Sequence, residues 1–123
     1  MSSVLVVEDS SPQREMISAL LKESGMVVSS AGDGVEALEQ IQVSPPDIVV
    51  LDIVMPRMNG YELCRRLKES PKTKEVPVVM CSTKGEEFDK YWGMKQGADA
   101  YIAKPFQPQE LIGTVKHLLR KAS

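Results

Sequence analysis

The chain has 123 residues, of which 42% are hydrophobic and 26% charged, as expected for one globular domain that buries a core. Its formal net charge of −2 excludes the strongly basic surface of a nucleic-acid-binding protein and the polybasic segment of a membrane-surface protein. No apolar stretch approaches the ~18 residues of a spanning helix, and an apolar segment follows Met1-Ser2-Ser3 directly, so we expect no signal peptide and a cytoplasmic protein.

The first two predicted strands lie on either side of an amphipathic helix. Residues 4–7, Val-Leu-Val-Val, predict a buried strand. Ser11 is suited to cap the helix that follows, and Pro12 to occupy its first position, where the N–H that proline lacks has no helical partner. Gly25 is expected to end this helix, and residues 26–31 predict the second strand.

The central part of the chain repeats this pattern. The turn Gly32-Asp33-Gly34 leads into a helix with apolar residues three apart. Residues 48–51, Ile-Val-Val-Leu, predict a third strand that is buried on both faces, and Asp52 follows it at once. A further helix is expected to start near Asn59-Gly60 and to bury one apolar stripe.

The last third of the chain contains two more pairs of a strand and a helix. Residues 76–81 predict the fourth strand, and residues 86–96 predict a helix that Gly97 ends. Residues 100–103 predict the fifth strand, and Pro108 opens a last amphipathic helix.

Strands that alternate with amphipathic helices indicate right-handed βαβ units and a parallel sheet. Five strands are too few to close a (βα)₈ barrel, so the expected fold is α/β, a (βα)₅ doubly wound open sheet. Residues 1–123 are expected to form a single domain, because no linker or low-complexity stretch interrupts the pattern. We also expect no output domain.

Polar and charged residues follow four of the predicted strands. They are Glu8-Asp9, Asp52, Ser82-Thr83 and Lys104-Pro105. Because the carboxyl ends of parallel strands lie at one edge of the sheet, we expect these residues to converge. Three close carboxylates need a cation between them, and oxygen ligands of this kind suit Mg²⁺. A Zn²⁺ site is not expected, because Cys64 and Cys81 form no CxxC motif and are predicted to be buried reduced thiols.

Asp52 is the candidate nucleophile of this group. Phosphoryl transfer needs an in-line nucleophile, a metal ion and donors for the phosphoryl oxygens. Lys104 would supply a positive charge worth about 4 kcal/mol at ~4 Å and an effective dielectric of ~20. Ser82 or Thr83 would supply a hydroxyl donor. With Mg²⁺ on Asp9 and Asp52, the latter is predicted to accept a phosphoryl group as an acyl phosphate.

Taken together, these motifs resemble the receiver domains of two-component response regulators, specifically the single-domain, chemotaxis-type (CheY-like) ones. The resemblance covers essentially the whole chain, with the motifs in the family's order and spacing. They are Glu8-Asp9, Asp52 with Met55-Pro56 and Asn59-Gly60, Ser82, Gly97-Ala98, Tyr101 and Lys104-Pro105-Phe106. The resemblance implies a flavodoxin-like sheet with the strand order 2-1-3-4-5.

The resemblance implies a role for each acidic residue of the site. Asp52 would be the residue that is phosphorylated. Asp9 would bind Mg²⁺ directly and Glu8 would bind it through water, while the backbone carbonyl of Val54 would complete the protein ligands. Mn²⁺ is expected to substitute for Mg²⁺. The pair Glu-Asp stands where many members of the family have Asp-Asp.

The resemblance also implies a switch. Ser82, with Thr83 beside it, and Lys104 would bind the phosphoryl oxygens, and a cis bond would precede Pro105. Tyr101 would move inward when Ser82 moves toward the phosphoryl group. The residues two beyond Asp52 and Ser82, which tune the lifetime of the acyl phosphate in this family, are Val54 and Lys84 here.

The implied partners are proteins, with no nucleic acid and no membrane. A CheA-like sensor histidine kinase would donate the phosphoryl group, and a downstream protein would bind the face formed by the helix at residues 86–96, the strand at 100–103 and the last helix. Part of an apolar group on the first of these helices is expected to be exposed for that partner: Phe88, Tyr91, Trp92 and Met94. The stretch 81–85 and Trp92 are also similar to receivers of pilus-driven twitching or phototaxis systems.

Three other functions remain open. A Mg²⁺-dependent phosphohydrolase of the haloacid-dehalogenase type would need a second aspartate at the position of Val54. A flavin-binding module would need a phosphate loop free of the carboxylates Glu8-Asp9. A degenerate receiver that only binds proteins would lack some of the site positions, all of which are filled here. We therefore expect a phosphoacceptor that assists its own phosphorylation and dephosphorylation, and not an enzyme with a separate substrate.

Overall fold

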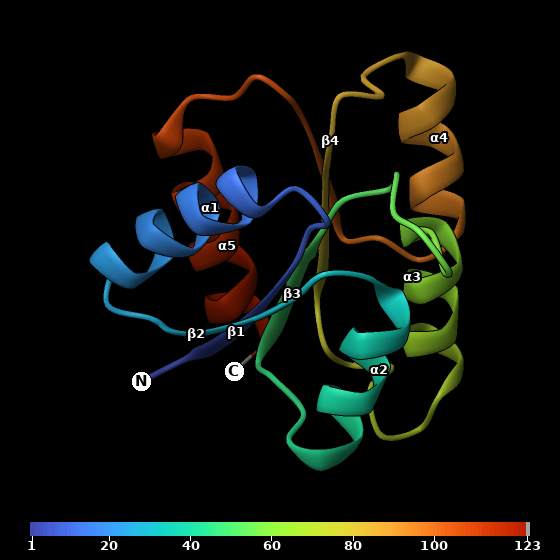
Figure 1. Ribbon diagram of the computed structural model, residues 1–123, viewed down its shortest axis with the longest axis horizontal. Helices are drawn as coiled ribbons and strands as arrows, with labels where there is room; N and C mark the ends of the chain where they lie inside the picture. The colour runs from blue at the N-terminus through green and yellow to red at the C-terminus, as the bar shows by residue number, and fades with distance from the viewer. Residues whose placement is uncertain (123) are drawn as a thin grey trace.

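A computed structural model of the protein describes residues 1–122, which fold into one parallel sheet with helices on both faces (Figure 1). The strands are β1 Ser3–Val7, β2 Val27–Ala31, β3 Ile48–Leu51, β4 Val78–Ser82 and β5 Ala100–Ala103. The helices are α1 Ser11–Glu23, α2 Gly34–Val43, α3 Gly60–Glu69, α4 Glu87–Lys95 and α5 Pro108–Ala122. Within residues 1–122, no helix has the length and apolarity needed to cross a bilayer.

The strand order is β2-β1-β3-β4-β5, with all pairs parallel, which confirms the predicted fold. The register between β1 and β3 pairs Val7 with Leu51. The ladder continues one step further, because the Asp52 N–H donates to the Val7 carbonyl. Glu8 and Asp52 therefore leave the sheet side by side at its carboxyl edge.

Alternation along the buried strands divides the core into two apolar layers. In β1, Leu5 and Val7 belong to the layer covered by α2 and α3, whereas Val4 and Val6 belong to the layer covered by α1 and α5. In Figure 1, α4 lies on the same side of the sheet as α2 and α3. The sheet separates these two layers, and the candidate site lies at its carboxyl edge.

Several element boundaries differ from the prediction by one or two residues, and the starts of α1 and β4 are two of them. Ser10, and not Ser11, is the residue before α1, so Pro12 is the second helical residue. Serine is a favoured capping residue, so the sequence alone does not distinguish Ser10 from Ser11. In the structure the Ser10 side chain makes no capping hydrogen bond. Strand β4 starts at Val78 and not at residue 76, because Pro77 has no N–H and the Val78 N–H donates to the Asp99 carboxylate.

Local signals fix the ends of the helices near the site. The Asp33 side chain caps α2 by accepting from the Glu36 N–H, and Asn59 caps α3 in the same way. Gly97, just after α4, has φ +106°, a left-handed conformation that glycine adopts without steric cost. These caps set where α2 and α3 begin, next to the loop that follows β3.

Candidate functional site

Three carboxylates converge at the carboxyl edge of the sheet. One ligand oxygen from each of Glu8, Asp9 and Asp52 lies within 4.8 Å of the others. Glu8 is buried, Asp52 is half-buried and Asp9 is exposed, so the cluster opens to solvent on the Asp9 side. An all-oxygen set with one open side fits Mg²⁺, which keeps several of its own waters. The structure thus brings together the three acidic residues expected to form the metal site.

Lys104 lies between the carboxylates and the first helix. Its Nζ donates to Glu8 Oε1 at 2.5 Å, to Gln13 Oε1 at 2.5 Å and to Asp52 Oδ2 at 3.4 Å. The side chain of Lys104 is 8% exposed, and that of Glu8 is 3% exposed. The buried ammonium thus donates to two of the three carboxylates, but its single positive charge neutralises only one of them, and the remaining negative charge favours a bound cation.

Burial and the hydrogen bond between Glu8 and Lys104 have opposite effects on the pKa of each residue. Burial raises the pKa of the Glu8 carboxyl, and the Lys104 hydrogen bond only partly opposes that effect. Burial alone would lower the pKa of Lys104, but the hydrogen bond to Glu8 and the charge of Asp52 outweigh it, so that the pKa is raised. Lys104 is therefore a permanent positive charge beside Asp52 at neutral pH.

Ser82 and Tyr101 are linked through the segment after β4. Ser82 is fully buried, its Oγ accepts from the Lys84 N–H at 3.3 Å, and its carbonyl accepts from the Lys104 N–H. The Tyr101 hydroxyl donates to the Lys84 carbonyl. Thr83 is exposed. Lys84 thus contacts both residues of the expected switch, while Thr83 lies at the surface.

The Tyr101 ring is half-buried and packs against α4. A Cβ on Gly93 would lie 2.7 Å from Met80 Sδ and 3.1 Å from Tyr101 Cδ2. Gly93 therefore gives the ring its space, although glycine is unfavourable in the middle of a helix. The next residue after Lys104, Pro105, follows a cis peptide bond.

The loop after β3 holds Asp52 by backbone contacts. The Ile53 N–H donates to Asp52 Oδ1 at 2.6 Å, and the Gly60 N–H donates to the Ile53 carbonyl at 2.8 Å. An added Cβ on Gly60 would lie 2.2 Å from the Asp52 carbonyl oxygen, so this backbone contact requires glycine. The side chain of Val54 is 56% exposed at the mouth of the site.

Arg57 and Asp33 form a second link in this loop that motif analysis did not identify. Arg57 has φ +66°, and its Nε and Nη2 donate to Asp33 Oδ2 at 2.9 and 2.7 Å. The backbone hydrogen bond from Glu36, with smaller contributions from Arg57, holds the pKa of Asp33 below its usual value. The ion pair fastens the loop after Asp52 to the start of α2.

The Asp33→Asn variant should lose this ion pair but keep a side-chain oxygen for the Glu36 N–H. A carboxyl whose pKa is lower in the folded state stabilises the fold above its unfolded pKa, near 3.8, and loses that contribution as the pH falls through the folded value. We expect a deficit of about 0.5–1 kcal/mol at pH 7, because the Arg57 side chain is solvent-exposed. Urea unfolding at pH 7 and at pH 3 measures it. A deficit of equal size at both pH values would contradict this account.

Gln13 is the site residue that sequence analysis missed. It lies in the first turn of α1 and supplies the amide oxygen on Lys104. A single glutamine near a helix start has no signature of its own. Only the contact between α1 and the segment after β5 reveals it.

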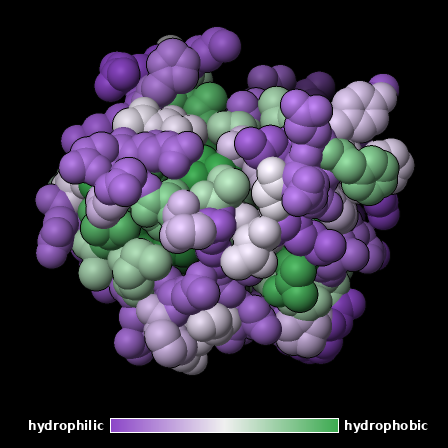
Figure 2. All heavy atoms as spheres, turned by 90° about the horizontal axis from the view of Figure 1, so that it is seen from above, coloured by the Kyte–Doolittle hydropathy of each residue, from purple (hydrophilic) through white to green (hydrophobic). Residues whose placement is uncertain are grey.

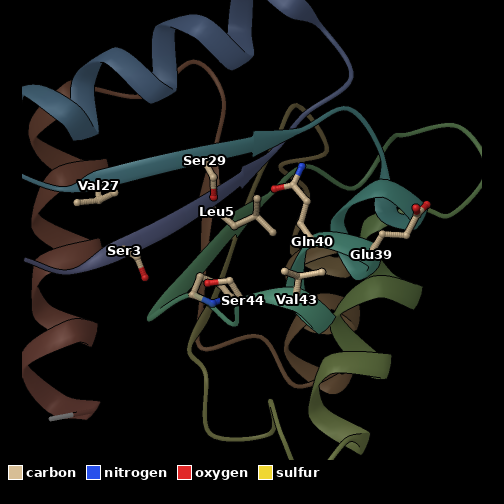
Figure 3. A pocket seen from close by; sticks show the side chains of 9 residues that line it. Ser3, Leu5, Val27, Ser29, Glu39, Gln40, Val43 and Ser44 are labelled. Carbon is tan, nitrogen blue, oxygen red and sulfur yellow. The ribbon is translucent and has the colours of Figure 1, made fainter.

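A surface groove of about 560 Å³ lies elsewhere on the molecule, between the edge strand β2 and α2 (Figure 3). Its lining residues include Val27, Ser29, Gln40 and Val43, and none of the acidic cluster.

The two cysteines are buried as expected, and burial raises the pKa of Cys64 to about 11 and that of Cys81 to about 12. Both thiols are therefore protonated at neutral pH, and neither supplies a thiolate nucleophile.

The four apolar side chains on α4 are all exposed, Phe88 to 72%. The others are Tyr91, Trp92 and Met94. Figure 2 shows a face of the molecule on which hydrophilic residues predominate and apolar groups appear in separate patches. His117 is exposed on α5, away from the cluster.

Comparisons with known proteins found a matching family model and similar proteins. Residues 4–116 match the sequence model of the response regulator receiver domain family. The chain is 42% identical over 113 residues to Protein PilG of Pseudomonas aeruginosa, covering 92% of this chain and 84% of PilG. It is 39% identical over 120 residues to the phosphate regulon transcriptional regulatory protein PhoB of Escherichia coli, covering 98% of this chain. The chain spans about half the length of PhoB, 52%.

Solved structures give the same result for the fold. The receiver domain of the Francisella response regulator 1452 superposes with a TM-score of 0.93 at 32% identity, covering the whole of both chains. The chemotaxis response regulator CheY4 of Vibrio cholerae superposes with a TM-score of 0.90 at 34% identity, covering 96% of this chain and 98% of CheY4.

Proposed function

Because the chain belongs to the response regulator receiver domain family, we propose that it accepts a phosphoryl group on Asp52 from a sensor histidine kinase and passes the signal to a partner protein. The observation that carries this proposal is the convergence of Glu8, Asp9, Asp52 and Lys104 at one edge of the sheet. A receiver is a phosphoacceptor in signalling and not an enzyme that turns over a separate substrate. The proposal includes a cytoplasmic location, because the protein must contact the phosphorylated domain of such a kinase.

The residues of the site can be given roles in the transfer. An oxygen of Asp52 attacks phosphorus in line, the P–N bond of the phosphohistidine breaks, and its electron pair stays on the imidazole. Mg²⁺ held by Glu8, Asp9 and Asp52, with the Val54 carbonyl as a further ligand, would neutralise charge on the carboxylates and the incoming phosphoryl oxygens.

The remaining groups act on the phosphoryl oxygens after transfer. Lys104 neutralises one oxygen, and the Ser82 hydroxyl turns toward another, away from the Lys84 N–H. Because Lys84 also accepts from Tyr101, a movement of Ser82 is carried to the Tyr101 ring and so to α4. Val54 and Lys84 flank the path of water to the acyl phosphate and would set its lifetime, while Thr83 remains at the surface.

The test uses acetyl phosphate and Mg²⁺ with intact-mass detection of the phosphoryl group. The wild-type protein should gain one phosphoryl group and lose it on treatment with hydroxylamine, which cleaves acyl phosphates. Asp52→Asn should gain none. Asp47→Asn is a matched control, because Asp47 precedes the same strand at its opposite end. Phosphorylation of Asp52→Asn at the wild-type rate would overturn the proposal.

We propose further that this receiver works in a chemotaxis-type or pilus-type pathway. The similarity to the chemotaxis response regulator CheY4 supports the chemotaxis-type assignment, and the resemblance of residues 81–85 and Trp92 to receivers of pilus-driven systems supports the pilus-type one. The downstream partner would bind the face formed by α4, β5 and α5, where Phe88 and Trp92 are exposed. Phosphotransfer kinetics provide the test. A purified CheA-type kinase should phosphorylate the chain faster than a kinase of a phosphate regulon, and the opposite preference would contradict the pathway.

A further inference from the structure

The ammonium of Lys104 has three N–H donors, and the structure gives each of them an acceptor. The two short hydrogen bonds, both 2.5 Å, go to Glu8 and Gln13, and the long one of 3.4 Å goes to Asp52. The side chain of Lys104 is 8% exposed, so water has little access to replace a lost acceptor. Lys104 is therefore held closer to α1 than to the residue that would be phosphorylated.

Gln13 is the one uncharged side chain among these three acceptors. A carboxylate at this position would add a fourth negative charge beside Glu8, Asp9 and Asp52. An apolar side chain would leave one N–H of the buried Lys104 without a partner. An amide oxygen satisfies the ammonium without either cost.

A phosphoryl group on Asp52 would bring new anionic acceptors to Lys104, which must then release one of its present ones. Lys104 donates as a cation in both bonds, but the Glu8 carboxylate carries a full negative charge whereas the Gln13 amide oxygen is neutral, so the bond to Gln13 is released more readily than the ion pair with Glu8. We propose that Gln13 is a positioning residue that holds Lys104 in the unphosphorylated state and yields it to the phosphoryl group. This inference rests on the proposed phosphorylation of Asp52.

Two substitutions at this position should act in opposite directions on phosphoryl capture. Gln13→Met has nearly the same shape but no acceptor, so it removes only the competitor of the phosphoryl group. Beryllofluoride, an analogue of the phosphoryl group, should then bind about three- to tenfold more tightly, the equivalent of one hydrogen bond. Gln13→Glu holds Lys104 with a charge and repels the anion, so beryllofluoride should bind about tenfold more weakly.

The experiment titrates beryllofluoride by fluorine NMR in saturating Mg²⁺ and measures the affinity for Mg²⁺ alone by calorimetry. Gln13→Met should keep the wild-type affinity for Mg²⁺, because Gln13 contacts Lys104 and not the open side of the carboxylate cluster. Gln42→Met, an exposed glutamine on α2, is the matched control and should equal the wild type in both measurements.

The beryllofluoride and Mg²⁺ affinities of the Gln13 variants together test the role of Gln13. Shifts of the two variants in opposite directions, with unchanged Mg²⁺ affinity in Gln13→Met, support the role of Gln13. Shifts in the same direction, no shift, or a parallel loss of Mg²⁺ affinity in Gln13→Met would overturn it. A wild-type protein that binds no beryllofluoride would instead refute the phosphorylation of Asp52, so the two failures are distinguishable.

Discussion

Replacing Gly60 with alanine is expected to lower the free energy of unfolding by about 3 kcal/mol or more and to abolish phosphoryl capture. The new Cβ would lie 2.2 Å from the Asp52 carbonyl oxygen and 2.8 Å from Ile53 Cα. Both atoms belong to the backbone, so no side chain can rotate away to make room. Relief requires the loop after β3 to move, and that movement displaces the Asp52 carboxylate from Glu8 and Asp9.

Urea unfolding measures the loss of stability, and beryllofluoride binding measures the loss of the site. Gly113→Ala in the middle of α5 is the matched control, because a Cβ there meets nothing within 4 Å. The control should gain about 0.5–1 kcal/mol from the better helix propensity of alanine. If Gly60→Ala were as stable as the wild type, the close backbone contact would not exist in solution.

Replacing Lys104 with methionine should have two separable effects. It leaves the Glu8 carboxylate, with a side chain 3% exposed, without a cation, and breaking a buried pair in this way costs about 3–5 kcal/mol. It also removes the positive charge beside Asp52, so the rate of phosphorylation by acetyl phosphate should fall about 10²-fold or more.

The double variant Lys104→Met with Glu8→Gln separates these effects. A neutral amide at position 8 needs no cation, so much of the lost stability should return in urea unfolding. Phosphorylation should not return, because the charge beside Asp52 is still absent and the metal site has also lost the Glu8 carboxylate. A double variant that recovered the wild-type rate of phosphorylation would show that Lys104 serves the fold alone.

The fold could be predicted because local signals and the global architecture agree. The apolar run at residues 48–51 is β3 without a change of boundary, and residues 100–103 are β5. Signals were weaker where two neighbouring residues suited the same position, as Ser10 and Ser11 did before α1. The start of β4 depended on a side chain far along the chain, Asp99, which no local pattern reveals.

The candidate site could be predicted to the extent that its residues directly follow strands. Glu8, Asp52 and Lys104 meet because parallel strands end at a common edge. Gln13 and Arg57 could not be found in this way. Their contacts depend on how α1 packs beside the segment after β5 and on the left-handed backbone at position 57.

The register of β1 against β3 also has a thermodynamic consequence. Glu8 and Asp9 are far from Asp52 in the sequence and are brought together only when these strands pair. An unfolded chain therefore offers a divalent cation only scattered carboxylates, and the ion binds the native state preferentially. By mass action, a free cation concentration one hundred times the dissociation constant adds about 2.7 kcal/mol to the free energy of unfolding. The free energy of unfolding of the protein should therefore depend on the divalent cation concentration of its surroundings.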